Sequence, residues 1–323
     1  MDFKVMMDVS RSNAYDYFGL TKFDVYHNNN SGLHSNYKYR HPFRSFSSLL
    51  SFALPFEHLS DPVHLTYFIQ RNWFLSIPFS IFYYTIIRVI QSAMRRRPPF
   101  ALNNALFSWN AALSVFSFFA LVRFSEDFVQ TWIHYGFTHT ICRTCNPQDV
   151  GGFWSFVFGC SKLLELGDTL FIVLRKRPLI FLHYYHHAAV VVYSAHSAAE
   201  HAAPAQAYGI MNMFVHWIMY AYYAYRATGK RTSSWIPMAV TTIQTTQMLL
   251  GVGITCYVCW LKVMHPHIPC QQSFANIYLA FFLYVTFAVL FVQFFVCAYI
   301  TKTHHRRKRE RMAAVAEKEK KAE

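Results

Sequence analysis

Seven stretches of this 323-residue chain are candidates for crossing a lipid bilayer, and they constrain the fold more than any other feature. A helix that crosses a membrane needs about 20 predominantly apolar residues. Asp, Glu, Lys and Arg make up only 14% of the chain, whereas about 25% is usual in soluble domains. The sequence therefore predicts an all-α polytopic membrane protein with spans at about 73–93, 101–123, 153–174, 180–200, 205–225, 235–260 and 275–300.

The segments on either side of the spans define the expected domain organisation. Residues 1–70 form a polar tail, rich in Asn, Ser and His, that lacks the apolar core of a signal peptide. Residues 71–301 form the seven-helix transmembrane domain, and residues 302–323 form a basic C-terminal tail. We expect the first transmembrane helix to direct the chain into the membrane.

The basic residues predict how the chain is oriented, because Lys and Arg are enriched in cytosolic loops. Every basic cluster follows an odd-numbered span; the clusters are Arg95–Arg97, Arg175–Arg177, Arg226 with Lys230 and Arg231, and Lys302–Arg311. The N-terminus is therefore expected in the lumen and the C-terminus in the cytosol. This distribution accounts for much of the net charge of +14 without a nucleic-acid partner.

Three short signals agree with that orientation. Asn29 begins an N-glycosylation sequon in the predicted luminal tail. Cys142, Cys145 and Cys270 fall in predicted luminal loops, where a disulfide can persist. The chain ends in Lys320–Glu323, a KKxx sequence of the kind that is read in the cytosol as an endoplasmic-reticulum retrieval signal. The expected location is the endoplasmic-reticulum membrane.

Charged side chains recur at helical spacing inside the third span. Lys162, Glu165 and Asp168 are three residues apart, and Thr169 follows, so they are expected on one helical face. Ionisable residues within a bilayer usually face a protein interior or a water-filled cavity. An internal ion pair that only fixes helix packing would explain part of this pattern, but two acids and one base leave a negative charge that needs a partner.

Histidines are aligned in the same way at the cytosolic start of the fourth span, at His183, His186 and His187. A single histidine is more often a packing residue, but three on one face at a membrane interface favour a functional site. In the fifth span Asn212 and His216 are the stronger candidates. A second group is explained almost as well by helix packing or interhelical hydrogen bonds, and it comprises Tyr220, Tyr222, Tyr223, Thr241, Gln244 and Gln247.

A metal site is not expected. The Cys142-x-x-Cys145 and Cys256-x-x-Cys259 pairs resemble a zinc framework, but the second pair lies inside an apolar span and more than a hundred residues separate the pairs. No bound cofactor is expected either.

Taken together, the four polar motifs resemble the signature motifs of the fatty-acid elongase (ELO) family. They occur in that family's order and are Lys162-x-x-Glu165-x-x-Asp168-Thr169, His183-x-x-His186-His187, Asn212-x-x-x-His216-x-x-Met219-Tyr220-x-Tyr222-Tyr223 and Thr241-x-x-Gln244-x-x-Gln247. The resemblance covers roughly residues 70–300. It implies an endoplasmic-reticulum 3-ketoacyl-CoA synthase in which six of seven helices form an inverted barrel around an acyl tunnel that opens to the cytosol.

The resemblance also implies the reaction and its residues. Acyl-CoA condenses with malonyl-CoA to give 3-ketoacyl-CoA, CO2 and CoA. The family's catalytic histidines map onto His183, His186, His187 and His216, and its luminal disulfide maps onto Cys270 with Cys142 or Cys145. Cys142 is the first choice because of its distance from Trp154.

Elementary chemistry suggests a role for each group, because a neutral imidazole is a competent nucleophile toward a thioester. We expect His186 to attack the acyl-CoA, with His183 and His187 orienting or exchanging protons. His216 and Asn212 are expected to stabilise oxyanion or enolate charge, and Glu165 and Asp168 to fix histidine tautomers. The candidate substrate-binding residues are Lys162, Arg175, Lys176, Arg177, Tyr220, Tyr223, Gln244 and Gln247; Arg175–Arg177 is the expected contact for CoA phosphates, whereas Lys162 lies deeper, within the buried network.

Substrate preference and partners are less constrained. Family members that act on polyunsaturated chains tend to carry Gln five residues before the first histidine, where this chain has Pro178, so it resembles the branch that handles saturated and monounsaturated chains. Expected partners are membrane lipid and the ketoacyl-CoA reductase and dehydratase of the elongation cycle, with homo-oligomerisation left open. The alternative functions are a di-iron desaturase or hydroxylase, which needs about eight histidine ligands, and a proton-coupled transporter.

Overall fold

The computed structural model describes residues 53–147 and 149–301, and the regular structure of this part of the chain is helical, which confirms the all-α prediction for it. The predictions for Asn29, for Lys302–Arg311 and for Lys320–Glu323 lie outside the described residues. The helices are α2 (Pro62–Asn72), η1 (Trp73–Leu75), α3 (Ser76–Met94), α4 (Asn103–Tyr135), α5 (Phe137–Cys142), α6 (Val150–Leu164), α7 (Gly167–Leu174), α8 (Phe181–Glu200), α9 (Ala205–Ala227), α10 (Trp235–Met264), α11 (Phe274–Phe295) and η2 (Val296–Thr301).

Within the described residues, four helical stretches are long and apolar enough to cross a membrane, and they are His64–Met94, Asn103–Tyr135, Trp235–Met264 and Phe274–Thr301. The remaining predicted spans, at 153–174, 180–200 and 205–225, are also occupied by helices, namely α6 with α7, α8 and α9. Polar side chains interrupt the apolar sequence of these helices. The count of seven crossings therefore stays a prediction.

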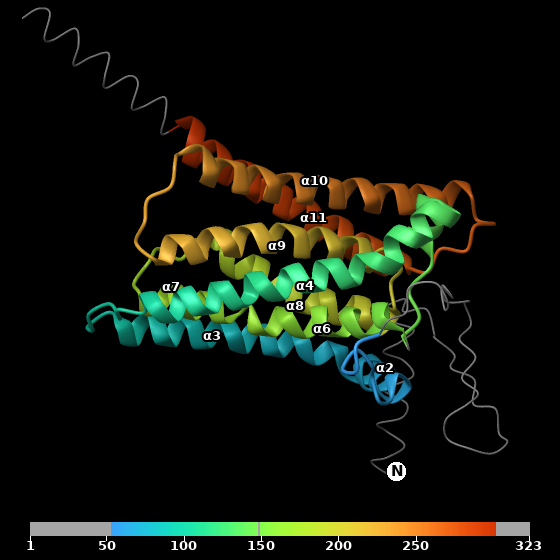
Figure 1. The fold of residues 1–323 in the computed structure, drawn as a ribbon, viewed down its shortest axis with the longest axis horizontal. Helices are drawn as coiled ribbons and strands as arrows, with labels where there is room; N and C mark the ends of the chain where they lie inside the picture. The colour runs from blue at the N-terminus through green and yellow to red at the C-terminus, as the bar shows by residue number, and fades with distance from the viewer. Residues whose placement is uncertain (1–52, 148, 302–323) are drawn as a thin grey trace, which may run out of the picture.

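The long helices run side by side to form an elongated bundle (Figure 1). α4 packs along α9 and α10 along α11, while α3 lies against α7 and α8. α8 contacts α6 and α11 as well as α3, so it lies inside the bundle. This position matters because the three predicted histidines of the fourth span belong to α8.

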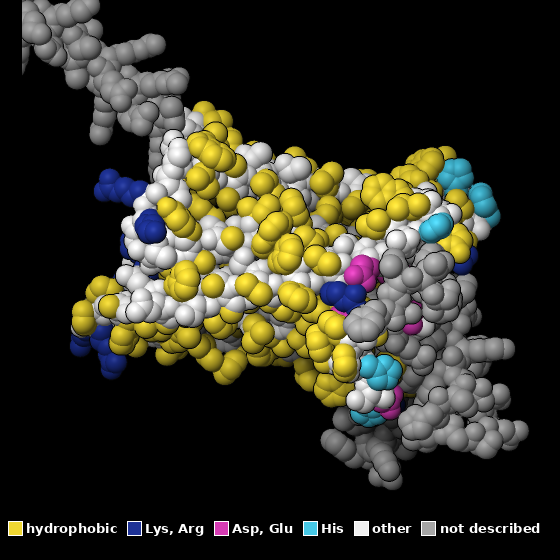
Figure 2. Space-filling model, in the orientation of Figure 1, with side chains coloured by type: hydrophobic (Ala, Val, Ile, Leu, Met, Phe, Trp, Pro, Cys, Tyr) yellow, Lys and Arg dark blue, Asp and Glu magenta, His cyan; other side chains and the backbone are white. Residues whose placement is uncertain are grey.

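The surface of the bundle divides by chemistry along its length. Apolar side chains cover the middle of the visible face, as a lipid-facing surface requires, and most of the visible Lys and Arg side chains gather at one end (Figure 2). Arg95–Arg97 follows α3, and Arg175–Arg177 joins α7 to α8. Histidine and acidic side chains appear at the opposite end of the same face.

The segment before α2 is anchored to the bundle by a buried carboxylate. Glu57 is 2% exposed and its Oε1 accepts hydrogen bonds of 2.7 Å from Arg123 Nε and from Trp154 Nε1. Burial acts to raise the pKa of Glu57, but the hydrogen bonds from Arg123, from the Leu54 N–H and from Trp154 outweigh it and lower the pKa to about 2. The ionised carboxylate thus ties the segment to α4 and α6.

A disulfide joins Cys142, at the end of α5, to Cys270, in the loop before α11. The family resemblance implied Cys270 with Cys142 or Cys145, and Cys142 was the first choice. Cys145 lies outside the disulfide, and its Sγ is 3.5 Å from Ser155 Oγ in α6. The bond connects segments that are 128 residues apart.

Candidate active site

The predicted third span is not one continuous helix, because α6 ends at Leu164 and α7 begins at Gly167. Tight turns join the two helices: the Asp168 N–H donates to the Glu165 carbonyl and the Thr169 N–H to the Leu166 carbonyl. A single helix would place all the polar residues on one face. Because of the break, the polar residues of α6 and those of α7 contact different side chains.

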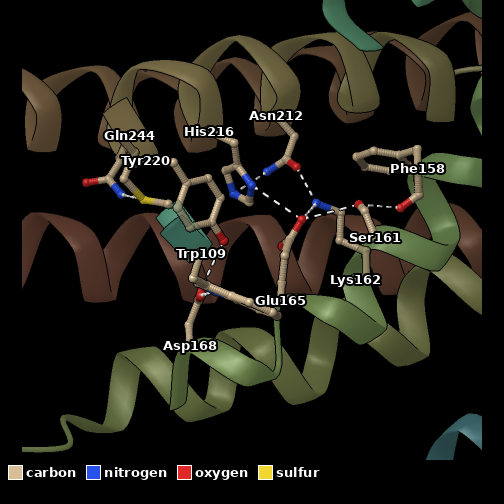
Figure 3. A network of polar contacts seen from close by, with 11 residues as sticks. Trp109, Phe158, Ser161, Lys162, Glu165, Asp168, Asn212, His216, Tyr220 and Gln244 are labelled. Atoms are coloured by element: carbon tan, nitrogen blue, oxygen red, sulfur yellow. Dashed lines mark hydrogen bonds and ion pairs between the residues drawn. The ribbon is translucent and has the colours of Figure 1, made fainter. Parts of the chain in front are cut away.

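Lys162 and Glu165, at the end of α6, join a network with α9 (Figure 3). Lys162 Nζ donates hydrogen bonds of 2.6 Å both to Glu165 Oε1 and to Asn212 Oδ1. Lys162 and Glu165 are only 2% and 3% exposed. A buried ion pair of this kind is tolerated when each partner has further hydrogen bonds, and Asn212 supplies one here.

The same network fixes the ring of His216. Because Asn212 Oδ1 accepts from the lysine, the amide nitrogen of Asn212 must face His216 Nε2, from which it is 3.1 Å away. An amide nitrogen can only donate, so Nε2 accepts and the ring proton resides on Nδ1. Nδ1 lies 3.4 Å from Glu165 Oε1. Glu165 therefore faces a histidine, as the sequence predicted.

Asp168, just after the break, is placed differently from expectation. Its Oδ1 accepts a hydrogen bond of 2.7 Å from Trp109 Nε1 of α4, and its Oδ2 accepts one of 2.6 Å from the Tyr220 hydroxyl of α9. Both carboxylate oxygens thus bind groups other than the histidines whose tautomers Asp168 was expected to fix (Figure 3). Asp168 instead joins α7 to α4 and α9.

The three histidines of α8 lie within its first two turns, next to the basic loop. The rings of His183 and His187 are 4.4 Å apart between centroids, and those of His186 and His187 are 5.5 Å apart. The ring of His186 packs on Phe287 of α11 at 4.9 Å. His187 is buried, and His183 and His186 are half-buried, so the rings face the protein interior.

This histidine group is near the network of α6 and α9. α8, which carries this group, packs against α6, which carries Lys162 and Glu165. The structure therefore brings four histidines from α8 and α9 together with one ion pair, although they are spread over 55 positions of the sequence from Lys162 to His216. The sequence motifs predicted this convergence.

The predicted substrate-binding residues fall into two places. Arg175 Nη2 donates a hydrogen bond to Asn103 Oδ1, and Lys176 Nζ donates to the Arg95 carbonyl, so these side chains lie at the basic end of the bundle. Arg177 is exposed there.

The remaining predicted contacts lie on α9 and α10. Gln244 Nε2 donates to Met219 Sδ at 3.1 Å, and Gln247 is 5% exposed. Tyr220 is buried and bound to Asp168, whereas Tyr223 is 43% exposed and its ring lies beside that of Tyr222. Of Tyr220 and Tyr223, only Tyr220 is therefore buried and hydrogen-bonded to the site.

Sequence reasoning missed two aromatic residues of the site, Trp109 and Tyr83. Trp109 is one of many aromatic residues in apolar spans, and only its contact with Asp168 distinguishes it. Tyr83, on α3, is 7% exposed and its hydroxyl is 2.5 Å from Thr169 Oγ1, which in turn is 3.0 Å from His183 Nε2. Helical spacing within one span gives no signal for such contacts between spans.

Comparison with known proteins agrees with this architecture. The chain is 50% identical over 289 residues to a Caenorhabditis elegans protein named "Putative fatty acid elongase 4", covering 90% of this chain and 95% of that protein. It is 36% identical to the Drosophila melanogaster "Very long chain fatty acid elongase 6", covering 82% and 84% of the two chains. It is 38% identical to the human protein of the same name, covering 75% and 90%.

A family model described as ELO, the GNS1/SUR4 family, matches residues 68–307. The match includes every residue of the histidine group and of the network around Lys162. The chain belongs to the ELO family.

Proposed function

We propose that this protein is the condensing enzyme of fatty-acid elongation, a 3-ketoacyl-CoA synthase that joins acyl-CoA to malonyl-CoA. Membership of the ELO family and the fatty-acid elongase names of its relatives support elongation. The observation that carries the proposal is the cluster of buried and half-buried imidazoles on α8 beside the network that orients His216. Pro178, five residues before His183, supports saturated or monounsaturated substrates.

In the first half-reaction, a nitrogen of His186 attacks the thioester carbonyl of the acyl-CoA. The carbon–sulfur bond breaks and CoA leaves as a thiolate. The proton that the imidazole loses converts this thiolate to the thiol that is released. The acyl group remains on His186 as an acyl-imidazole. Neighbouring His183 and His187 are placed to exchange that proton.

In the second half-reaction, malonyl-CoA loses CO2 and the resulting enolate attacks the acyl carbon. The bond between the acyl carbon and His186 breaks, the 3-ketoacyl-CoA is released, and the imidazole recovers a proton from the medium. His216, held by Asn212 and Glu165, is placed to stabilise the charge on the enolate or on the tetrahedral oxyanion. Its fixed orientation means that little rearrangement is needed as that charge develops.

The proposed setting is the endoplasmic-reticulum membrane, with seven crossings, a luminal N-terminus and a cytosolic C-terminus. α8 has 20 residues and α9 has 23, which at 1.5 Å per residue is about the thickness of a bilayer core. His187 of α8 and Asn212 and His216 of α9 are buried within the bundle. Arg175–Arg177 and the mouth of the proposed barrel would then face cytosolic CoA.

A condensation assay tests the proposal directly. Membranes containing the protein, incubated with acyl-CoA and radiolabelled malonyl-CoA, are expected to form a labelled 3-keto product two carbons longer. His186→Ala is expected to abolish it, whereas His265→Ala, in the loop between α10 and α11, serves as the matched control. Product formation that is unaffected by His186→Ala would contradict the assignment of the nucleophile.

Two further measurements refine the proposal. Intact-mass analysis after incubation with acyl-CoA alone is expected to show an acyl adduct, and its absence would favour direct condensation. An acyl-CoA series of increasing length and unsaturation defines the preferred substrate. Reductase and dehydratase partners are proposed because a 3-ketoacyl-CoA must be reduced and dehydrated before another round of elongation.

A further inference from the structure

A chain of hydroxyl groups connects α3 to the histidine group through α7. The Tyr83 hydroxyl lies 2.5 Å from Thr169 Oγ1, and Thr169 Oγ1 lies 3.0 Å from His183 Nε2. Tyr83 is 7% exposed and Thr169 is fully buried, at 0%. Water therefore does not compete for the hydrogen bond between Tyr83 and Thr169, and its direction is determined by the two hydroxyl groups themselves.

The acidity of the two hydroxyl groups indicates that direction. A phenol is a much stronger acid than an aliphatic alcohol, so the Tyr83 hydroxyl is the better donor and Thr169 Oγ1 accepts from it. The single proton of the Thr169 hydroxyl is then available to His183 Nε2. In this arrangement Nε2 accepts and the proton of the His183 ring resides on Nδ1.

We propose that Tyr83 and Thr169 are positioning residues that hold His183 in its Nδ1-protonated tautomer for the condensation reaction. The proposal rests on the function proposed above. Since Nε2 accepts from the threonine hydroxyl, it does not attack the thioester, and the Nδ1–H group of His183 remains to donate a proton. Tyr83 thus gives α3 a role in the reaction beyond packing against α7 and α8.

Interhelical tyrosine–threonine pairs also occur where they only join helices, and the pair formed by Tyr208 and Thr255 serves for comparison. The Tyr208 hydroxyl lies 2.8 Å from Thr255 Oγ1, joining α9 to α10, and the Thr255 hydroxyl donates to the Gly251 carbonyl of its own helix. The threonine of the Tyr83 pair instead contacts a histidine nitrogen. The Tyr208 pair is therefore a matched control.

The experiment compares four variants of the full-length protein in the condensation assay. Thr169→Val keeps the shape of the side chain but removes the hydroxyl, whereas Thr169→Ser keeps the hydroxyl. Tyr83→Phe removes the phenol oxygen, and Tyr208→Phe does the same in the control pair. We expect Thr169→Val and Tyr83→Phe to lower kcat about tenfold or more, within the range for general acid–base groups, with the KM for acyl-CoA unchanged. Thr169→Ser and Tyr208→Phe are expected to stay within about twofold of the parent, because each keeps the hydroxyl chain to His183.

The outcomes are decisive in both directions. A kcat at the parent level in Thr169→Val and Tyr83→Phe, or equal losses in Thr169→Ser and Thr169→Val, would overturn the proposal. A parallel rise in KM would indicate a binding role and would also overturn it. If Thr169→Val does not fold, Tyr83→Phe decides alone. Failure of the parent protein to condense would instead refute the proposed function, so the two failures are distinguishable.

Discussion

Trp109 of α4 donates a hydrogen bond of 2.7 Å to Asp168 of α7, across the break between α6 and α7. The indole ring approaches this break so closely that a Cβ atom on Gly167 would lie 2.7 Å from Trp109 Cζ2. The residue directly before Asp168 in the motif therefore has to be small. The hydrogen bond and the glycine together determine how α7 leaves α6.

Gly167→Ala is therefore expected to destabilise the protein, although alanine usually favours a helix over glycine. Displacing the indole should cost about 1–3 kcal/mol, which is typical of overpacking, and should reduce condensation by disturbing Asp168. Gly159→Ala, in α6, is the matched control because no atom lies within 4 Å of its added Cβ. Thermal unfolding in detergent checks both variants, and equal melting temperatures would contradict the packing argument.

Lys162→Met is expected to be strongly destabilising because it leaves Glu165 buried without its cation. Breaking a buried pair from one side typically costs about 3–5 kcal/mol. The double variant Lys162→Met with Glu165→Gln removes both charges and should recover much of the melting temperature. It should not recover condensation, since His216 loses the carboxylate 3.4 Å from its Nδ1. A double variant as unstable as the single one would show that the pair is not coupled.

Cys142→Ser is expected to lower the stability of the unreduced protein by about 2–5 kcal/mol, the usual range for loss of a native disulfide. The bond closes a segment of 128 residues, and Cys270→Ser should have the same effect. Cys145→Ser is the control, with a smaller effect. Melting temperatures with and without reductant check this: reductant should lower the value of Cys145→Ser but not that of Cys142→Ser.

Acid is expected to weaken the contact of Glu57 with Arg123. The pKa of Glu57 is lowered from 4.5 to about 2, so the folded state binds a proton less readily than the unfolded chain. The stabilisation is complete above about pH 4.5 and is lost as the pH falls towards 2. Melting temperatures of the parent and of Glu57→Gln, measured from pH 7 down to pH 3, should converge. Parallel curves would contradict this.

The sequence predicted the positions of the helices well, because each predicted span carries an apolar run that must leave water. The expectation that Glu165 fixes a histidine tautomer came from the chemistry of catalytic triads, and Glu165 Oε1 lies 3.4 Å from His216 Nδ1. The sequence did not predict the separate environment of Asp168, because the break before Gly167 interrupts the helical repeat. Nor did it identify Trp109 or Tyr83, whose partners lie 59 and 86 positions away. Spacing within one helix contains no information about such pairs.

The packing of α4 along α9 has a consequence for the biogenesis of the protein. α4 ends at Tyr135 and α9 begins at Ala205, so the ribosome delivers the first long before the second. In the interval a buried group of α4 such as Ser114, whose hydroxyl donates to the Trp217 carbonyl in the finished bundle, has no α9 to contact. The nascent chain would need the insertion machinery or a membrane chaperone to shield α4 until α9 emerges.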